Sequence, residues 1–560
     1  MASFKVSAVV PAIAGTLLLA ALSEPTSAQS CPIVTDPTPL NANAAEDCDF
    51  DDFAQLATDG EGNWIAIWTW SYRGGCSDVL CTPEIMLARS TDNAVTWSTP
   101  ALLDSSAALP YSPDNWMPQI VTDKAGTWLA VWSSTDDLGG TIDNDMDILL
   151  ARSTDDGATW SPPAALNTYA HYDEVGDDHL DRFNDTSPQL AIDSTGDWVA
   201  VWASKIDLGG TIGDDFDILF SRSTDGGITW DVPAALNTNA ASDSRRDSDP
   251  QLATNATGGW VVIWESSDDL GGTIGRDLDI LFSRSTDNAV TWSPPAPLNT
   301  NAAFDSGSDR HAQFATDRAG HWVVAWFSTD DLGGTIGDDY DVLFSRSADD
   351  GLTWTAPAPL NNNAPFDDRW DRHPDLATDG TGNWVAAWIV RDPAEGPYYD
   401  DEDIFFSFSM DNGHTWSDPV ALNTNAVDDL GDDWFPQVAT DHHGNWIVVW
   451  SSNDGLGGAA CCDDYDILVT HFSRLTDCNG NGVPDECDMR DGTSADCNEN
   501  GIPDECDILG GGNHDCNGNN SPDVCDIASG ISRDRLFNGP DGIPDECQRW
   551  DDPLPEPETH

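Results

Sequence analysis

The stretch STDGGITW, from Ser223 to Trp230, recurs along the chain and decides its fold. Its pattern is S-x-D-x-[GA]-x-T-W. Ser and Asp side chains hold a tight reversal through hydrogen bonds to the backbone. The fifth residue is usually Gly, which tolerates a positive φ, and the closing Trp can pack between sheets. The other copies are Ser90–Trp97, Ser153–Trp160, Ser285–Trp292, Ser347–Trp354 and Ser409–Trp416.

These octets are spaced almost regularly. The last Trp of each copy follows the previous one by 63, 70, 62, 62 and 62 residues. A period of this size indicates one supersecondary unit that is repeated and stacked against its neighbours.

Each repeat is expected to contain four strands. In the fourth repeat they are Pro250–Thr254, Trp260–Trp264, Leu278–Ser285 and a short strand around 296–298, bounded by turn residues. In the second strand, W-x-x-x-W places both rings on one face, because side chains alternate along a strand. Seven such pairs occur: Trp64/Trp68, Trp128/Trp132, Trp198/Trp202, Trp260/Trp264, Trp322/Trp326, Trp384/Trp388 and Trp446/Trp450.

The seventh repeat has no octet and ends near Ser473. Its missing fourth strand is expected at the other end of the chain, because TPLNANA (Thr38–Ala44) matches APLNTNA (Ala296–Ala302). Pairing of the two ends closes the ring and leaves no long unpaired edge. We therefore predict an all-β fold: a seven-bladed β-propeller of four-stranded blades, closed by the N-terminal strand, followed by a small loop-rich repeat module.

The octet resembles the Asp box of the sialidase (BNR-repeat) family, which lies at a turn between the third and fourth strands of a propeller blade. The resemblance implies a structural role for the octets. Ala94 and Ala289 stand where the family has Gly, so distorted turns are expected there. Catalytic sialidases have six blades, whereas the repeats here predict seven.

The chain has 560 residues, with 98 acidic and 23 basic residues and a formal charge of −75. This charge disfavours nucleic acids and anionic membranes as partners. The acidity has two open explanations, a saline habitat or calcium binding.

The N-terminus has the features of a secretory signal peptide. Lys5 precedes an apolar run, Val6–Leu22, and Thr26-Ser27-Ala28 offers a cleavage site. The run is short and contains Pro11, which argues against a membrane span. We expect a signal peptide at 1–28, a propeller at 31–474, calcium-binding repeats at 475–548 and a disordered tail at 549–560, in a protein that is secreted or held at the cell surface.

Cysteines are expected to form disulfides in an exported protein. Six of them flank the predicted seam between the first and last blades: Cys31, Cys48, Cys76, Cys81, Cys461 and Cys462. Those in the C-terminal repeats are more consistent with disulfides than with zinc, and their pairing is left open.

The C-terminal repeats carry the clearest chemical signal. DCNGNGVPDECD, Asp477–Asp488, recurs at Asp496–Asp507 and Asp515–Asp526, and a degenerate copy spans Asn538–Cys547. Oxygen donors at positions 1, 3, 5, 7, 9 and 12 suit Ca²⁺. The predicted ligands are Asp477, Asn479, Asn481, Val483 (carbonyl), Asp485, Asp488, Asp496, Asn498, Asn500, Ile502 (carbonyl), Asp504, Asp507, Asp515, Asn517, Asn519, Ser521, Asp523, Asp526, Asp541 and Asp545.

These repeats resemble the calcium loops of dockerins and thrombospondin type 3 repeats. Position 12 is Asp rather than Glu, and no flanking helices are expected, so thrombospondin-like wrapping is the nearer likeness. The alternative is an acidic, disulfide-held linker without metal.

A second acidic pattern occurs in the propeller, in the near-identical loops Asp136–Leu149, Ile206–Leu219, Asp268–Leu281 and Asp330–Leu343. They join the second and third strands, so they are expected on the face opposite the octets. Calcium binding and a solvated, duplicated turn are both open for them.

The same face is expected to carry aromatic residues suited to stacking on sugars, although they can equally pack the loops: Trp116, Tyr172, Trp370, Tyr399 and Trp434. Sialidases hold a substrate carboxylate with an arginine triad. Arg372-His373-Pro374 resembles their R-I-P motif, and Arg310 holds the same register one blade earlier. These two arginines are weak catalytic candidates, since no Tyr/Glu pair or acid/base Asp can be assigned.

The sequence therefore favours an exported, non-catalytic, sialidase-like propeller with a Ca²⁺-binding C-terminal module. Its expected partner is a glycan or an extracellular or cell-surface protein. The alternatives are an active exo-α-sialidase and a purely structural cell-surface protein.

Overall fold

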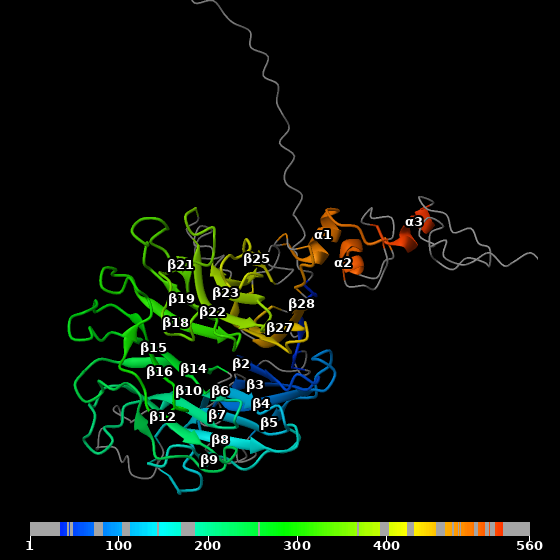
Figure 1. Cartoon of the computed structure of the whole chain (residues 1–560). Helices are drawn as coiled ribbons and strands as arrows, with labels where there is room; N and C mark the ends of the chain where they lie inside the picture. Colours follow the sequence, from blue (N-terminus) through cyan, green and yellow to red (C-terminus); the bar gives the residue numbers. More distant parts are fainter. Residues whose placement is uncertain are drawn as a thin grey trace, which may run out of the picture.

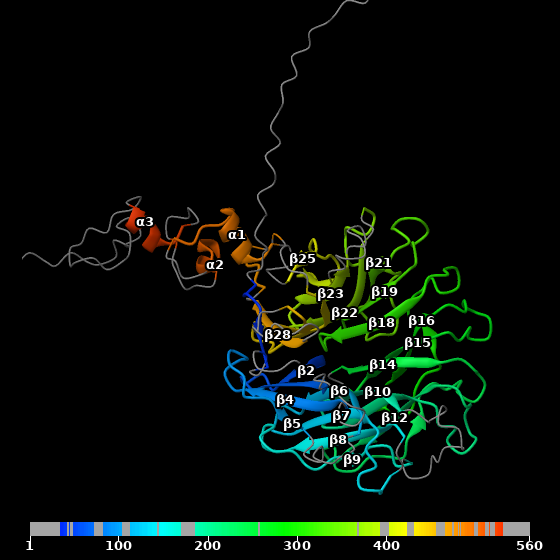
Figure 2. The ribbon, with the colours of Figure 1, turned by 180° about the vertical axis from the view of Figure 1, so that it is seen from behind.

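The computed structural model forms a ring of seven four-stranded antiparallel sheets (Figures 1 and 2). It describes residues 34–41, 44, 49–71, 82–103, 113–142, 145–169, 185–255, 258–366, 369–391, 402–422, 431–454, 465–472, 475–479, 481, 483–497, 502–509, 515 and 521–529. The predicted all-β propeller with seven blades is confirmed, and the loop-rich C-terminal part follows it in the chain.

The blades follow one another in chain order. The first contains β2 (Phe50–Thr58), β3 (Trp64–Ser71), β4 (Glu84–Ser90) and β5 (Ala101–Leu102). The second contains β6 (Asn115–Thr122), β7 (Trp128–Ser134), β8 (Asp147–Ser153) and β9 (Ala164–Ala165). The third contains β10 (Thr186–Ile192), β11 (Trp198–Ser204), β12 (Asp217–Ser223) and β13 (Ala234–Ala235). The fourth contains β14 (Asp247–Thr254), β15 (Trp260–Ser266), β16 (Asp279–Ser285) and β17 (Ala296–Pro297).

The fifth blade contains β18 (Asp309–Thr316), β19 (Trp322–Ser328), β20 (Asp341–Ser347) and β21 (Ala358–Pro359). The sixth contains β22 (Trp370–Thr378), β23 (Trp384–Arg391), β24 (Glu402–Ser409) and β25 (Val420–Ala421). The seventh contains β26 (Asp433–Thr440), β27 (Trp446–Ser452), β28 (Asp466–Phe472) and, from the other end of the chain, β1 (Thr38–Pro39).

The N-terminal strand closes the ring as the sequence predicts. Thr38 pairs with Val469 and Pro39 with Leu468, so β1 becomes the outer strand of the last blade. The six cysteines expected to support this seam lie outside the described residues.

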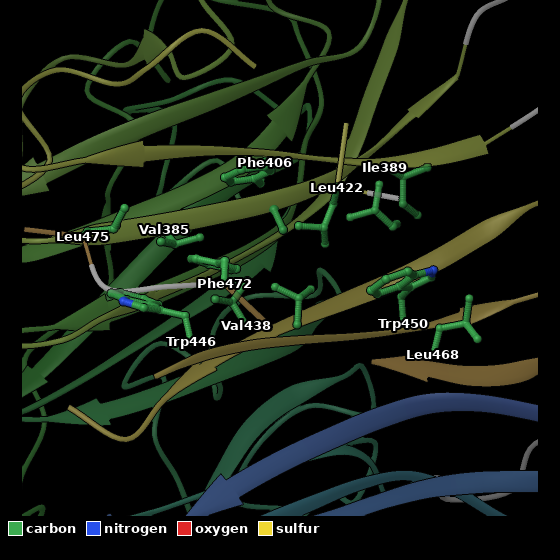
Figure 3. Close-up of a cluster of buried hydrophobic side chains, with 13 residues drawn as sticks. Val385, Ile389, Phe406, Leu422, Val438, Trp446, Trp450, Leu468, Phe472 and Leu475 are labelled. Atoms are coloured by element: carbon green, nitrogen blue, oxygen red, sulfur yellow. The ribbon is translucent and has the colours of Figure 1, made fainter. Parts of the chain in front are cut away.

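The core lies between the blades rather than within them. Both Trp residues of each W-x-x-x-W pair are buried, and among the described residues the buried apolar side chains form seven clusters. Figure 3 shows one of these, in which Val385, Ile389 and Phe406 of the sixth blade share a buried cluster with Trp446 and Trp450 of the seventh. Burial of such rings at about 25 cal/mol per Å² makes these interfaces the main source of stability.

Each octet forms the same hydrogen-bonded turn. In the third blade, Ser223 Oγ accepts the N–H of Gly227 at 2.9 Å, and Asp225 accepts the N–H and the hydroxyl of Thr229 at 2.9 and 2.6 Å. The closing Trp packs toward the preceding blade, as Trp292 does against Phe220 at 5.7 Å between ring centroids.

The expectation that Ala94 and Ala289 distort their turns is wrong. Both residues adopt a positive φ, 60° and 57°, and both donate their N–H to the octet Ser, at 2.9 and 3.0 Å. The turn keeps its shape because its side-chain hydrogen bonds outweigh the about 1–2 kcal/mol that this conformation costs a residue with a Cβ.

The loops lie on two opposite faces, as predicted. The octet turns contact the turns between first and second strands, for example through the bond from Asn93 N–H to Gly62 O. The loops between second and third strands contact the connections between blades, for example through the bond from Gly213 N–H to Ala240 O. We call the face that carries the octet turns the octet face. The opposite face, which carries the loops between second and third strands and the connections between blades, is called the loop face.

The C-terminal region contains three short helices, α1 (Asp485–Asp491), α2 (Asp504–Leu509) and α3 (Asp523–Ser529). Of these, α1 lies nearest the ring and α3 lies farthest from it (Figures 1 and 2). The expectation that no helices flank the acidic loops is therefore wrong, because the second loop follows α1 and its last four residues form the first turn of α2. Each helix begins directly after a Pro and has acidic residues in its first turn, a combination that favours a helix N-terminus.

Among the described residues, no helix has the length and apolar character needed to cross a membrane.

Candidate functional site

The innermost strand of every blade carries an irregularity at the same position. Its pairing with the second strand shifts register there, as between Arg310 and Gln313 in β18. One residue at each shift has a positive φ near 50°: Phe53, Met117, Ser187, Asp249, His311, His373 and Phe435. All seven line one cavity of about 150 Å³ on the propeller axis.

This backbone conformation is unusual for such side chains. A positive φ costs a residue with a Cβ about 1–2 kcal/mol, and for bulky residues such as Phe53 and Phe435 it is rare. Strain of this kind is found preferentially at functional sites. The repetition of the strain around the axis therefore makes this cavity the candidate site.

The residue before each strained position also holds one register in all blades. These residues are Asp52, Trp116, Thr186, Ser248, Arg310, Arg372 and Trp434. Four of them were singled out from the sequence: Trp116, Arg310, Arg372 and Trp434. The blades therefore place these four at equivalent positions beside the axial cavity.

Arg372 does not present a free guanidinium. It forms an ion pair with Glu402, whose other oxygen accepts the indole N–H of Trp434 at 2.6 Å. The guanidinium carbons of Arg372 and Arg391 lie 5.5 and 5.1 Å from the centre of a ring of Trp370. Trp370, Arg372 and Trp434 thus hold one another in place through Glu402, which sequence reasoning missed.

Arg310 differs from Arg372 in its surroundings. It is exposed, and within the described residues its side chain forms no hydrogen bond or ion pair. Its neighbour His311 donates its N–H to Glu265 of the preceding blade at 2.5 Å. Of the two predicted arginines, Arg310 is the one available to an anionic group.

Glu265 is buried behind the cavity wall, against the backbone of His311, and its pKa is shifted. Burial raises its pKa to about 7, and the charge of Asp249 adds to this, while the backbone N–H of His311 and the charge of Arg310 act in the opposite direction. Asp249 itself accepts the hydroxyl of Ser187 at 3.0 Å. Glu265 is therefore a carboxyl group that can be protonated near neutral pH.

The two histidines of the cavity are adjacent, with ring centroids 4.4 Å apart. Burial lowers the pKa of His373 to about 3, assisted by the charges of His311 and Arg372. The pKa of His311 is also lowered, mainly by burial. The ring of His373 is thus neutral at pH 7 and acts as an aromatic or hydrogen-bonding surface.

At the octet face, a cavity of about 330 Å³ opens at the other end of the axis. It is lined by Lys124, Arg318 and His442, from three different blades. The pKa of His442 is lowered by burial and then by the charge of Lys124. This is a local concentration of cationic side chains in a strongly acidic protein, and the sequence alone did not indicate it.

The predicted glycan-contacting residues are only partly described. Trp116 is 36 % exposed, Trp370 and Trp434 are half-buried, and Tyr172 and Tyr399 lie outside the described residues.

In the first C-terminal loop, predicted calcium ligands converge. The side-chain amides of Asn479 and Asn481 each donate to Asp488 at 2.8 Å, and Asp477 accepts the N–H of Asn481 at 3.1 Å. Positions 1, 3, 5 and 12 of the loop are thus connected. Predicted ligands outside the described residues are Asn498, Asn500, Asn517, Asn519, Asp541 and Asp545.

Disulfides join consecutive C-terminal repeats. Cys478 is bonded to Cys506 and Cys497 to Cys525, so position 2 of one loop is linked to position 11 of the next. These cysteines lie close to Asp485 and Asp504, but their disulfides leave no thiolate for a metal.

One protein-family model matches part of the chain. Residues 196–432, from near the start of β11 to the segment before β26, match the model of the BNR repeat-like domain. No curated protein matches the chain.

Several solved structures are similar. A protein of unknown function from Dyadobacter fermentans is 15% identical, with 64% of this chain and 94% of that chain covered and a TM-score of 0.41. The Hadza microbial sialidase Hz136 is 16% identical, with 72% and 76% covered and a TM-score of 0.40. A polysaccharide lyase of family PL25, an ulvan lyase, is 12% identical, with 78% and 93% covered and a TM-score of 0.43. The match to the BNR repeat-like domain covers residues 196–432, which lie within the ring of seven blades.

Proposed function

We propose that this protein is an exported propeller that binds a glycan at the loop-face end of its axial cavity. The observation that carries the proposal is the contrast between the two kinds of repeated position. Structural positions keep one residue type in every blade, as the W-x-x-x-W pairs do, whereas the seven strained cavity positions carry Phe, Met, Ser, Asp, His, His and Phe. Different side chains on one backbone frame build an asymmetric surface, which a ring of purely structural repeats does not require.

The chemistry of this surface suits a sugar. Trp116 offers a partly exposed aromatic face for stacking, and Asp249, which lines the cavity, offers carboxylate oxygens as acceptors for hydroxyl groups. Arg310 supplies a cation that can bind a carboxylate on the ligand. Given the net charge of −75, long-range attraction of polyanions is disfavoured, so a neutral or singly charged glycan is the better fit.

A glycan array probed with the full mature chain tests the proposal, followed by calorimetry on each hit. Trp116→Ala and Arg310→Ala should each weaken binding at least tenfold, about 1.4 kcal/mol. Arg318→Ala is the matched control, since Arg318 follows the same strand at the octet face. Flat signals from a folded protein would refute glycan binding and favour a structural or protein-binding role.

Glu265 favours a second candidate, hydrolysis of a glycoside. A carboxyl group with a pKa of about 7 can act as a general acid near neutral pH. Release of fluorophore from an α-sialoside, compared between the parent and Glu265→Gln, tests this. The binding proposal expects no turnover by the parent, whereas turnover that is lost in Glu265→Gln would establish an enzyme.

The C-terminal repeats are proposed to bind Ca²⁺. Support comes from their all-oxygen donor set and from the convergence of Asn479, Asn481 and Asp488 in the first loop. Bound calcium would supply the positive charge that these acidic loops lack and so order them. Asp488→Asn in the full chain should remove one bound Ca²⁺ by calorimetry, and unchanged uptake would contradict this assignment.

A further inference from the structure

Two triads of aspartates gather at the junctions between blades on the loop face. In the first, Asp217 is the first residue of β12 and Asp215 lies two residues before it, in the loop between β11 and β12. Asp243 lies in the connection to the next blade. One carboxylate oxygen from each lies within 4.8 Å of the others. The second triad has the same arrangement one blade later: Asp277, Asp279 and Asp305. We call these the first and second junction sites.

The central carboxylate of each junction site is buried with an oxygen unused. Asp217 is 0% exposed; its Oδ1 accepts the amide of Asn237 at 2.6 Å, but its buried Oδ2 has no hydrogen-bond partner in the described structure. Asp279 is 1% exposed, and its Oδ1 accepts the amide of Asn299 at 2.7 Å. Other buried oxygens without a partner in this part of the chain are Oδ2 of Asp279, Oδ2 of Asp215, Oδ1 of Asp243, Oδ2 of Asp277 and both oxygens of Asp305.

Buried carboxylate oxygens without a hydrogen-bond donor destabilise the folded state. A buried acceptor without a donor costs about 1–3 kcal/mol, and more when it carries charge. Several of them pointing into one space is a strong indication that a positively charged partner belongs there.

The backbone holds each triad together. A Cβ on Gly213 would lie 2.2 Å from Oδ1 of Asp215, so glycine at this position lets the carboxylate fold back over the loop. In the second junction site, a Cβ on Gly275 would lie 2.1 Å from Oδ1 of Asp277. The N–H of Gly213 also donates to Ala240 O at 3.1 Å, in the connection that carries Asp243. The two loops are therefore tied together independently of any ion.

No basic side chain neutralises these carboxylates. Among the described residues, none of the six aspartates forms an ion pair. The nearby Arg246 instead lies over the ring of Phe216, at 4.9 Å. Asn239 donates to both Asp243 and Asp268, which brings a further carboxylate to the first junction site.

We propose that each junction site binds one Ca²⁺. One cation ties the segment at the start of β12 to the connection that leads to the fourth blade, and the other ties the segment at the start of β16 to the connection that leads to the fifth. Ligand oxygens lie 2.3–2.6 Å from Ca²⁺, so two oxygens on one ion are at most about 5 Å apart; the separations within 4.8 Å satisfy this limit. The donors are all carboxylate oxygens, without imidazole or thiolate, which selects a hard cation over a transition metal.

Part of the arrangement recurs in the fifth blade. Asp339 and Asp341 follow Gly337, whose Cβ would lie 2.1 Å from Oδ1 of Asp339. The third position of that triad falls outside the described residues, so the proposal is limited to the two complete triads. It does not depend on the glycan proposal, because neither junction site includes a residue of the axial cavity.

The test is calorimetric titration of Ca²⁺ into the EDTA-treated full chain, in an Asp488→Asn/Asp507→Asn/Asp526→Asn background that weakens the C-terminal loops. Asp215→Asn/Asp243→Asn should lower the number of bound ions by one, and Asp277→Asn/Asp305→Asn by one more. Asp214→Asn is the matched control, since Asp214 is exposed in the same loop and is not part of the triad; it should bind as its parent does.

Thermal unfolding separates a calcium site from a merely structural cluster. In EDTA, Asp215→Asn/Asp243→Asn should melt at or above the parent temperature, because charge repulsion is removed. In Ca²⁺ it should melt below the parent, because the bound ion is lost. Unchanged ion uptake, or equal destabilisation in EDTA and in Ca²⁺, would overturn the proposal.

Discussion

The amide of Asn41 donates a hydrogen bond to Asp466, 425 residues away in the sequence, at 2.7 Å. The same amide donates to Asp51 at 2.8 Å, and Asn41 Oδ1 accepts the N–H of Ile467 at 3.2 Å. One fully buried side chain thus connects β1, β2 and β28 and closes the ring. Asn299 makes the equivalent three contacts between the fourth and fifth blades.

Asn41→Ala should therefore destabilise the protein by about 3–5 kcal/mol, since it leaves two buried carboxylates short of a donor. Urea unfolding measures the loss. Asn299→Ala is the matched control and should cost a similar amount. Only Asn41→Ala should accelerate hydrogen exchange at Leu40, whose N–H pairs with Ile467 O at 2.7 Å. Equal exchange in both variants would show that the seam is no weaker than an ordinary junction.

Gly227→Ala should destabilise by about 2–4 kcal/mol. Gly227 has a φ of +77°, and its added Cβ would lie 2.4 Å from Leu129 Cδ1 in the preceding blade, so backbone strain and overpacking add. Gly209→Ala separates the two effects, because Gly209 has a φ of +72° and nothing within 4 Å of its added Cβ. It should cost only about 1–2 kcal/mol. Equal losses in denaturant unfolding would mean that contact with Leu129 is unimportant.

Asp225→Asn should reduce stability at pH 7 but not in strong acid. The hydroxyl and N–H of Thr229 and the hydroxyl of Ser223 lower the pKa of Asp225 to about 2. A lowered pKa stabilises the folded state above the unfolded value near 4, and this contribution is lost as the pH falls through about 2. The difference between parent and variant in urea unfolding should thus shrink between pH 4 and pH 2. A difference independent of pH would exclude the charge as its origin.

Lys124→Met should raise the pKa of His442. Burial is the main cause of the lowered pKa of this histidine, and the charge of Lys124 is the next. Removal of that charge favours the protonated imidazole. Titration of the imidazole by NMR measures the shift. Lys205→Met, a change at the end of β11 far from this cavity in sequence and on the other face, should leave the pKa of His442 unchanged.

The local patterns of the sequence predicted much of the fold. The strands of the fourth blade lie within one to three residues of the predicted bounds, because alternation of apolar side chains and turn residues acts over a few positions. The octet likewise forms its turn from its own Ser, Asp and Thr side chains. Even the closure by Thr38–Pro39 was visible, since the N-terminal segment repeats a motif that the last blade lacks.

The helices of the C-terminal repeats were not predicted, although the sequence contains a pattern that favours a helix start. Pro484 followed by Asp485 and Glu486 is a favourable helix start, and the same residues also belong to the calcium-type spacing of the repeat. The distortion expected at Ala94 and Ala289 was wrong because residue preference was weighed without the hydrogen bonds that hold the turn.

The sequence by itself determined the repeat, its strands and the number of blades, because each depends on interactions between residues close in the chain. Only the tertiary structure decided which distant residues meet. Asp243 meets Asp215 and Asp217 because the connection that leaves the third blade folds back onto the loop before β12. Arg372 is held by Glu402 while Arg310 remains open, and seven inner strands bring unlike side chains to one cavity. These groupings follow from ring closure, whose geometry no short stretch of the chain contains.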